Sequence, residues 1–183
     1  MGSPESDLQN RVAKRFGVLP NFFRLAPETP EITEKLWGFA SALGWYVQGL
    51  AERSSLAIDL KIPDNFGRLP SQIELFIFRL VQECLTNIHR HSGSKTALIR
   101  IAREESTVEV EIEDQGKGMS PERLTEIQSQ GTGVGIRGMR ERVRHLRGNL
   151  VIESNDSGTK VYATLPITTS LPPHKSDTRQ VVA

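Results

Sequence analysis

Cysteine is nearly absent from this sequence: its 183 residues include only Cys84, and aromatic side chains make up 6%. A single thiol excludes an internal disulfide framework and a four-cysteine zinc site, and it is typical of a protein in a reducing compartment. No apolar run is long enough to span a bilayer, and residues 1–5 lack the basic and apolar layout of a signal peptide. We therefore expect a cytoplasmic protein with no membrane segment.

A large excess of charge of either sign is also lacking. Lysine and arginine total 23 against 22 for aspartate and glutamate, so the net charge is +1. The chain offers no broad attraction to nucleic acid or to an anionic membrane, and any phosphate binding has to be local. Hydrophobic residues (37%) and charged residues (25%) stand in the proportion of a globular protein with one main domain.

Hydrophobic spacing predicts an alternation of helices and strands. Ser71 is the expected N-cap of one helix, and Thr29 and Ser120 each precede a proline at a first helical position. Residues 168–183, rich in proline, serine and threonine, are expected to be disordered. The expected helices cover residues 29–52, 71–91 and 136–147, with another beginning at 120–122, and the expected strands cover 56–62, 96–103, 106–113, 149–154 and 159–166.

The helix expected over 71–91 carries two polar residues, Glu83 and Asn87, beside its apolar stripe. Because they are four residues apart, they share one face of the helix. A carboxylate can orient a nucleophile or hold a metal-bound water, and an amide oxygen is a neutral hard ligand suited to Mg²⁺. The alternative is an exposed polar pair without a ligand, and the pair by itself does not separate the two readings.

Asp114 follows an expected strand and precedes two glycines, Gly116 and Gly118. Such a turn allows the backbone to approach a ligand closely while the carboxylate points into the mouth of the sheet. An ionised carboxylate only accepts hydrogen bonds, so its natural partner on a ring is an exocyclic amine such as adenine N6. A tight turn closed by an aspartate-to-backbone hydrogen bond is the structural alternative.

The segment 131–138 is denser in glycine than a turn requires, and it leads directly into a helix. Its N–H groups and the positive end of that helix predict phosphate binding. Three of its glycines also match the GxGxxG spacing of a dinucleotide fold, with Glu153 near the position of the ribose acid. That alternative requires a preceding strand, whereas residues 126–130 form a polar stretch with no strand pattern.

These motifs stand in order along the chain, at residues 82–92, 114–119 and 131–142. Together they resemble the ATPase domain of the gyrase, Hsp90, histidine kinase and MutL superfamily, and they are most similar to the nitrate-sensor and desaturase-sensor histidine kinases. The resemblance covers about residues 41–167. It implies a two-layer α/β sandwich, with a mixed, largely antiparallel sheet covered by helices on one face, after a helical N-terminal segment.

The resemblance also implies a role for each motif. Glu83 and Asn87 would be catalytic, as the polar residue of the N box and the Mg²⁺ ligand, and Asp114 would read the adenine of ATP. Thr159, after Gly158, would support the adenine site through its hydroxyl group. The other residues implied to bind ATP belong to the first glycine box and the ATP lid: Gly116, Gly118, Met119, Gly131, Thr132, Gly133, Val134 and Gly135.

The sequence departs from those kinases ahead of this domain. They carry there a two-helix dimerisation element with a phospho-accepting histidine, whereas this chain has no histidine before residue 89. Residues 15–24 loosely resemble instead the opening of the carboxymuconolactone decarboxylase and alkylhydroperoxidase-like helical domains, whose activity needs a cysteine pair that is missing. We expect residues 1–40 to be a helical remnant or scaffold, residues 41–167 the ATP-binding domain, and residues 168–183 a tail.

The function implied is transfer of the γ-phosphoryl group of Mg²⁺-bound ATP to a histidine, and onward to the aspartate of a response regulator. The acceptor histidine would belong to a dimerisation domain in another chain, and a homodimer fits this arrangement. Two other functions fit the same motifs: a non-catalytic, nucleotide-gated interaction module, and a serine kinase of the anti-sigma-factor type.

Overall fold

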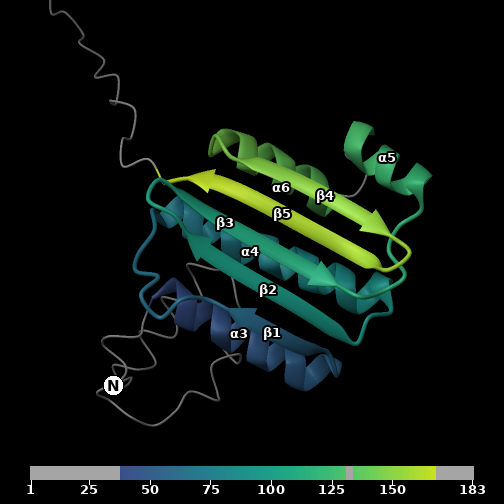
Figure 1. The fold of residues 1–183 in the computed structure, drawn as a ribbon, viewed down its shortest axis with the longest axis horizontal. Coiled ribbons are helices and arrows are strands. Elements are labelled where there is room, and N and C mark those ends of the chain that lie inside the picture. The colour runs from purple at the N-terminus through teal and green to yellow at the C-terminus, as the bar shows by residue number, and fades with distance from the viewer. Residues whose placement is uncertain (1–37, 131–133, 168–183) are drawn as a thin grey trace, which may run out of the picture.

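The computed structural model describes residues 38–130 and 134–167. Their centre is a five-stranded sheet in the order β1-β2-β3-β5-β4 (Figure 1). β1 and β2 are parallel, and the other neighbouring pairs are antiparallel. The mixed, largely antiparallel sheet predicted from the sequence is thus confirmed. The strands are β1 Ala57–Lys61, β2 Thr96–Arg103, β3 Thr107–Asp114, β4 Asn149–Asn155 and β5 Gly158–Pro166.

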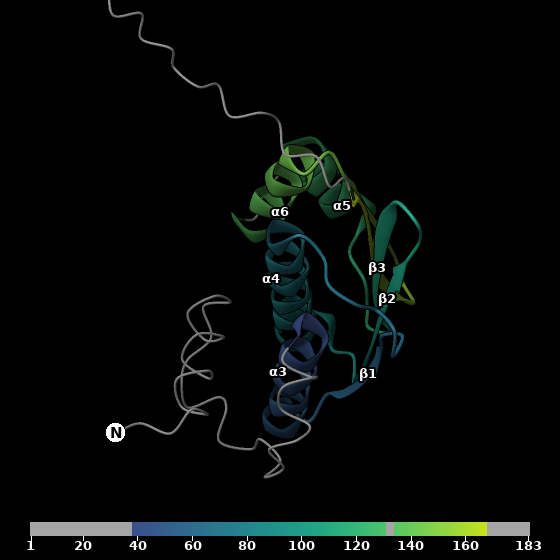
Figure 2. The ribbon, with the colours of Figure 1, turned by 90° about the vertical axis from the view of Figure 1, so that its left-hand side faces the viewer.

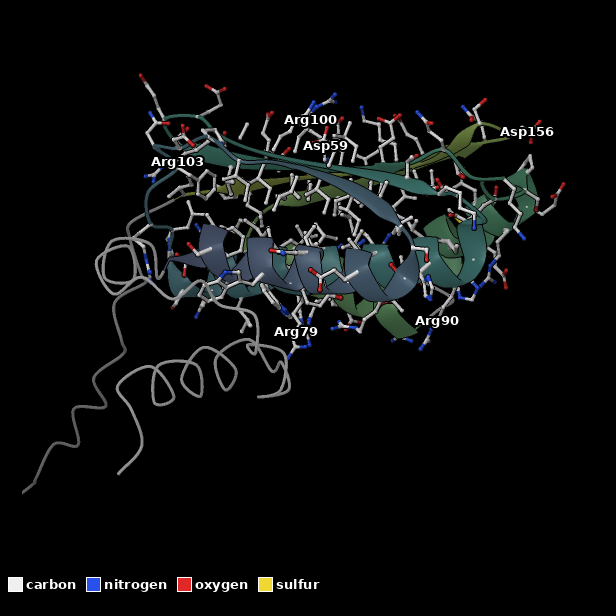
Figure 3. The ribbon with its side chains drawn as sticks, turned by 90° about the horizontal axis from the view of Figure 1, so that it is seen from below. Asp59, Arg79, Arg90, Arg100, Arg103 and Asp156 are labelled. Carbon is white, nitrogen blue, oxygen red and sulfur yellow. The ribbon has the colours of Figure 1, made fainter. Side chains whose placement is uncertain are left out.

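Helices cover one face of this sheet, as the views from the side and from below show (Figure 2; Figure 3). On β3, Val108, Val110 and Ile112 are buried, while the glutamates between them are partly exposed on the other face. No helix within the described residues is long and apolar enough to cross a membrane. The helices are α3 Phe39–Ser54, α4 Ser71–Asn87, α5 Pro121–Gln130 and α6 Val134–His145.

The prediction that Ser71 caps a helix is wrong. Ser71 is the first residue of α4, no side chain caps this helix, and Pro70 occupies the N-cap position. Pro70 suits this position because its carbonyl oxygen accepts two N–H groups of the first turn at 2.9 and 3.1 Å, and its φ is fixed by the ring. The predicted cap Ser120 is confirmed, since its hydroxyl oxygen accepts the Arg123 N–H at 3.3 Å.

Helix α4 also ends differently from the expectation. α-Helical geometry stops at Asn87, and a π-helical turn, η2 (Ile88–Ser92), takes the place of the last residues of the helix expected to reach 91. Gly93 follows with a φ of 72°, in the left-handed region that glycine adopts readily. The described part of the helix expected over 29–52 is α3, whereas Thr29 and the segment 15–24 lie outside the described residues.

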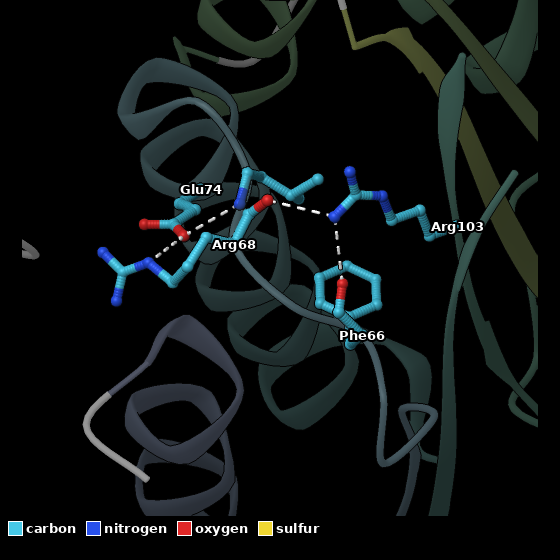
Figure 4. Close-up of polar contacts among 5 residues, drawn as sticks. Phe66, Arg68, Glu74 and Arg103 are labelled. Atoms are coloured by element: carbon cyan, nitrogen blue, oxygen red, sulfur yellow. Dashed lines mark hydrogen bonds and ion pairs between the residues drawn. The ribbon is translucent and has the colours of Figure 1, made fainter. Parts of the chain in front are cut away.

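A loop over residues 62–70 joins β1 to α4 and is held from both sides (Figure 4). From the sheet, Arg103 Nη1 donates to two carbonyl oxygens of the loop at 3.2 and 3.0 Å. From α4, the Glu74 carboxylate is 0% exposed; it accepts the Leu69 N–H at 3.2 Å and pairs with Arg68 Nε at 3.4 Å. This buried carboxylate therefore fixes the start of α4.

Replacing Glu74 by alanine is expected to lower the free energy of unfolding by about 1–3 kcal/mol, because the Leu69 N–H loses a buried acceptor. Glu141→Ala is the matched control: Glu141 pairs with Arg137 on an exposed surface, so its loss should cost less than about 0.5 kcal/mol. Urea unfolding followed by circular dichroism measures both variants. Equal effects would show that the Glu74 contacts do not stabilise the fold.

Candidate nucleotide-binding site

The end of the α4–η2 helix and the end of β3 are in direct contact. Ser92, the last residue of η2, accepts the Lys117 N–H at 2.9 Å through its carbonyl oxygen. A Cβ at Gly116 would collide with the Ser92 backbone, so no side chain fits between the helix end and the turn after β3. The motifs at residues 82–92 and 114–119 therefore lie side by side.

Glu83 and Asn87 lie on one face of α4, as their spacing predicts, and both are partly buried. Asn87 Nδ2 donates to Glu83 Oε1 at 3.4 Å, a long hydrogen bond that leaves the amide oxygen of Asn87 for another partner. Gly135 of α6 packs on this carboxylate, because a Cβ at Gly135 would collide with Glu83 Oε1. The polar face of α4 and the start of α6 thus meet at Glu83.

Asp114, the last residue of β3, is buried, with 4% of its surface exposed. Burial raises the pKa of its carboxyl group, and the hydrogen bond from the Gly116 N–H offsets only part of the rise. The Gly116 nitrogen lies 2.8 Å from Oδ1. The turn closed by an aspartate-to-backbone hydrogen bond is therefore present, and it fixes the direction of a buried acceptor.

The glycines near Asp114 make room for the protein's own backbone. Gly118 has a φ of +62°, and a Cβ there would collide with the carbonyl oxygen of Asn155, the last residue of β4. A Cβ at Gly158, which has a φ of +137°, would collide in the same way with the carbonyl oxygen of Asp114. The close approach that the sequence predicts at Gly118 is thus made by a backbone segment that is distant in the sequence, and the predicted approach of a ligand stays a prediction.

Ser154 and Ser92 are two residues of the site that sequence reasoning missed. Ser154 of β4 accepts the Met119 N–H at 2.9 Å, and its hydroxyl oxygen lies 2.8 Å from Thr159 Oγ1. Thr159 is thereby connected to the turn that carries Met119. The signal that could have found Ser154 is its inward-facing strand position, where a hydroxyl without a partner would be costly.

The third motif lies partly outside the described residues, which do not include Gly131, Thr132 and Gly133. Val134 and Gly135 belong to the first turn of α6, which begins two residues earlier than the expected helix over 136–147. The first N–H groups of a helix have no partner within it, so this start keeps the donors expected for phosphate binding. A helix, α5, precedes the motif instead of a strand, which excludes the dinucleotide-fold alternative.

Cys84 is buried next to this site, but its thiol is unsuited to act as a nucleophile. Burial raises the pKa of its thiol, and the charges of Glu83 and Asp114 raise it further. Within the described ranges, no three His, Cys, Asp or Glu side chains are grouped to hold a metal ion. A cleft of about 310 Å³ between α6 and β4 is separate from the site, since Glu83, Asn87 and Asp114 do not line it.

Residues 72–169 match the family described as "Histidine kinase-, DNA gyrase B-, and HSP90-like ATPase". The chain belongs to this family. It is 32% identical to DegS of Brevibacillus brevis, a signal transduction histidine-protein kinase/phosphatase, over 72% of this chain and 33% of DegS. It is 26% identical to the sensor histidine kinase MctS of Rhizobium johnstonii, over 85% of this chain and 33% of MctS. The chain spans about a third of the length of these relatives.

Solved structures share the fold. The histidine kinase domain of the Erythrobacter litoralis EL346 blue-light activated histidine kinase matches 88% of this chain and 74% of its own length, with a TM-score of 0.63 at 19% identity. The catalytic domain of the histidine kinase ThkA matches 70% of this chain and 91% of its own length, with a TM-score of 0.56 at 13% identity. The predicted histidine kinase ATPase fold is confirmed, and so is the resemblance to sensor histidine kinases.

Proposed function

We propose that this chain is the Mg²⁺-ATP-binding catalytic domain of a two-component sensor kinase, and that it transfers the γ-phosphoryl group of ATP to a histidine of another chain. The observation that carries the proposal is that Glu83, Asn87 and the start of α6 lie together at the helix end that contacts the turn after Asp114. The sensor-kinase relatives support it. In this proposal a response-regulator aspartate receives the phosphoryl group from the histidine.

The donor set fits ATP and Mg²⁺. Asp114 is a buried group that only accepts hydrogen bonds when ionised, which suits the exocyclic amine of adenine. Asn87 keeps an amide oxygen outside its hydrogen bond to Glu83, and Mg²⁺ takes few protein ligands, prefers oxygen and keeps several waters. The start of α6 presents N–H donors and the positive end of the helix dipole to phosphates.

The proposed transfer gives each of these residues a defined role. Asp114 orients the base and Asn87 holds the metal, which when bound would neutralise charge on the phosphates. Glu83 fixes the Asn87 amide, and its carboxylate orients a nucleophile or a metal-bound water. Catalysis of this kind depends on position and charge, so the acceptor histidine has to be presented in line with the γ-phosphate.

The test is a titration of the chain with ATP, with and without Mg²⁺, beside a transfer assay with the histidine-bearing dimerisation domain of a related sensor kinase and its response regulator. We expect Mg²⁺-dependent ATP binding and a label on the acceptor histidine. Binding without transfer would favour the nucleotide-gated interaction module, and a label on a partner's serine would favour the anti-sigma-factor type. A folded chain that binds no ATP would contradict the proposal.

Gly135→Ala is expected to weaken Mg²⁺-dependent ATP binding about fivefold, because the new methyl group displaces the Glu83 carboxylate from its rotamer at a cost of about 1 kcal/mol. Gly138→Ala, on the same helix, is the control: a Cβ at Gly138 meets no described atom within 4 Å. It should bind ATP like the wild type and gain about 0.5–1 kcal/mol of stability from better helix propensity. Equal ATP affinities of the two variants would show that the contact between Gly135 and the Glu83 carboxylate does not contribute to ATP binding.

A further inference from the structure

The helix-covered face of the sheet changes from apolar to polar at the end of β3. One apolar row that runs across β3, β5 and β4 is buried: Ile112, Val161 and Ile152. Two residues nearer that end, the register places Asp114 opposite Thr159 and Thr159 opposite Ser154. Directly opposite residues of antiparallel strands point to the same face of a sheet. The core therefore ends in a row of three polar side chains, of which Asp114 is the first.

The hydroxyl group of Ser154, the last member of this row, has three close polar contacts. Its oxygen accepts the Met119 N–H at 2.9 Å, and it lies 3.1 Å from the Gly158 carbonyl oxygen and 2.8 Å from Thr159 Oγ1. A hydroxyl group has one proton, and a carbonyl oxygen only accepts. When all three contacts are hydrogen bonds, the Ser154 proton goes to Gly158, and the Thr159 proton makes the bond between the two hydroxyl groups.

This arrangement of protons decides what Thr159 offers to the base site. With its proton on Ser154, the Thr159 hydroxyl group has only lone pairs left, and the ionised Asp114 beside it is also an acceptor. Opposite residues of antiparallel strands have Cβ atoms about 4.5–5.5 Å apart, so one ligand group can reach both acceptors. An exocyclic amine brings two N–H donors to this pair, whereas a 6-oxo group brings a third acceptor.

We propose that Ser154 is a positioning residue that sets base specificity: by accepting the Thr159 proton, it keeps the Thr159 hydroxyl group an acceptor and favours a 6-aminopurine nucleotide over a 6-oxopurine one. The inference rests on the proposed function and deepens it, since it names a determinant of which nucleotide binds. Ser154 acts through Thr159 and does not touch the base. Without Ser154, the Thr159 proton is free to be donated into the site, where a 6-oxo group accepts it.

The test compares the affinities of the chain for ATP and for inosine triphosphate, its 6-oxo analogue, by titration calorimetry with Mg²⁺ present. Ser154→Ala is expected to lower the ratio of the ATP affinity to the inosine triphosphate affinity about five- to tenfold, because Thr159 gains a proton to donate. Ser154→Thr keeps the hydroxyl group and should keep the wild-type ratio. Ser157→Ala, an exposed serine in the turn between β4 and β5, is the matched control and should also keep it.

Thr159→Val tests whether Ser154 acts through the Thr159 hydroxyl group. Valine has no proton to direct, so in a Thr159→Val background Ser154→Ala is expected to change the ratio of the two affinities no further. The same five- to tenfold change in that background, marked as about equal to the change in the wild-type background, would overturn the inference, because it would show that Ser154 acts by another route.

An unchanged ratio in folded Ser154→Ala, whether both affinities stay or fall together, would overturn the inference and leave the proposed function intact. A wild-type chain that binds both nucleotides equally well would do the same. Failure of the wild-type chain to bind ATP would overturn the proposed function and this inference with it. If Ser154→Ala does not fold, Ser154→Cys carries the same comparison, since a thiol is a weak acceptor for the Thr159 proton.

Discussion

Asp114→Ala is expected to bind ATP about ten- to a hundredfold more weakly than the wild type, because the adenine amine loses a buried, charged acceptor. The truncation also frees the Gly116 N–H, which lies 2.8 Å from the carboxylate, so the turn itself loses its fixed geometry. Titration calorimetry with Mg²⁺ present measures the affinity. Asp156→Ala, an exposed aspartate in the turn between β4 and β5, is the control and should bind like the wild type (Figure 3). Unchanged affinity in a folded Asp114→Ala protein would contradict the assignment of the adenine reader.

The isosteric change Asp114→Asn should separate binding from stability. Burial raises the pKa of Asp114, so the folded protein holds this proton more tightly than the unfolded chain does. Ionising the carboxylate therefore costs stability, and this cost is absent below the unfolded-state pKa of about 3.9 and complete above the raised folded-state pKa. Without nucleotide, Asp114→Asn should be more stable than the wild type at neutral pH and should lose that advantage as the pH falls.

Urea midpoints of the two proteins, measured from neutral to acidic pH, test the predicted direction of this difference in stability. The neighbouring carboxylate Glu113 also raises the pKa of Asp114, so its repulsion is part of the cost that Asp114→Asn removes. Equal midpoints at neutral pH, or an advantage of Asp114→Asn that grows as the pH falls, would show that the buried carboxylate is stabilised in its ionised form.

Local patterns were enough to predict the sheet and its inward faces, because strand alternation is set by burial at every second residue. They could not predict the start of α4. The carbonyl oxygen of Pro70 accepts the first N–H groups of α4, and Glu74 reaches back over five residues to the Leu69 N–H, a contact that no local cap pattern predicts. The π-turn could not be predicted from the sequence either, because its single extra residue leaves the spacing of the apolar residues up to Ile88 unchanged.

Motif spacing likewise placed Glu83 and Asn87 on one helix face, where the structure has them. The contacts that complete the site join segments far apart in the sequence. Gly135 packs on Glu83, and Ser154 accepts the Met119 N–H, and neither contact follows from a local pattern. The sequence thus predicted which residues share a helix face, while the contacts between distant segments depend on the fold.

The chain alone is expected to bind ATP without phosphorylating its own histidines, of which it has four. His89 and His91 are exposed in η2, directly after the proposed metal ligand Asn87, and cannot move to the far side of the γ-phosphate. His145 is the last residue of α6, and His174 lies outside the described residues. Correct positioning is worth an effective concentration of about 10⁵–10⁸ M, so a histidine that is merely present accepts label only at background level.

An added acceptor domain should instead gain an acid-labile, alkali-stable label from γ-labelled ATP, and Asn87→Ala should slow this transfer about 10²–10³-fold by removing the proposed ligand of the metal. Asn65→Ala, an exposed asparagine in the loop before α4, is the control and should transfer at the wild-type rate. A label on the isolated chain that disappears when one of its four histidines is replaced would show that the acceptor lies within the chain. If Asn87→Ala transferred phosphate at the wild-type rate, Asn87 would not be the metal ligand, because phosphoryl transfer depends on a correctly positioned metal ion.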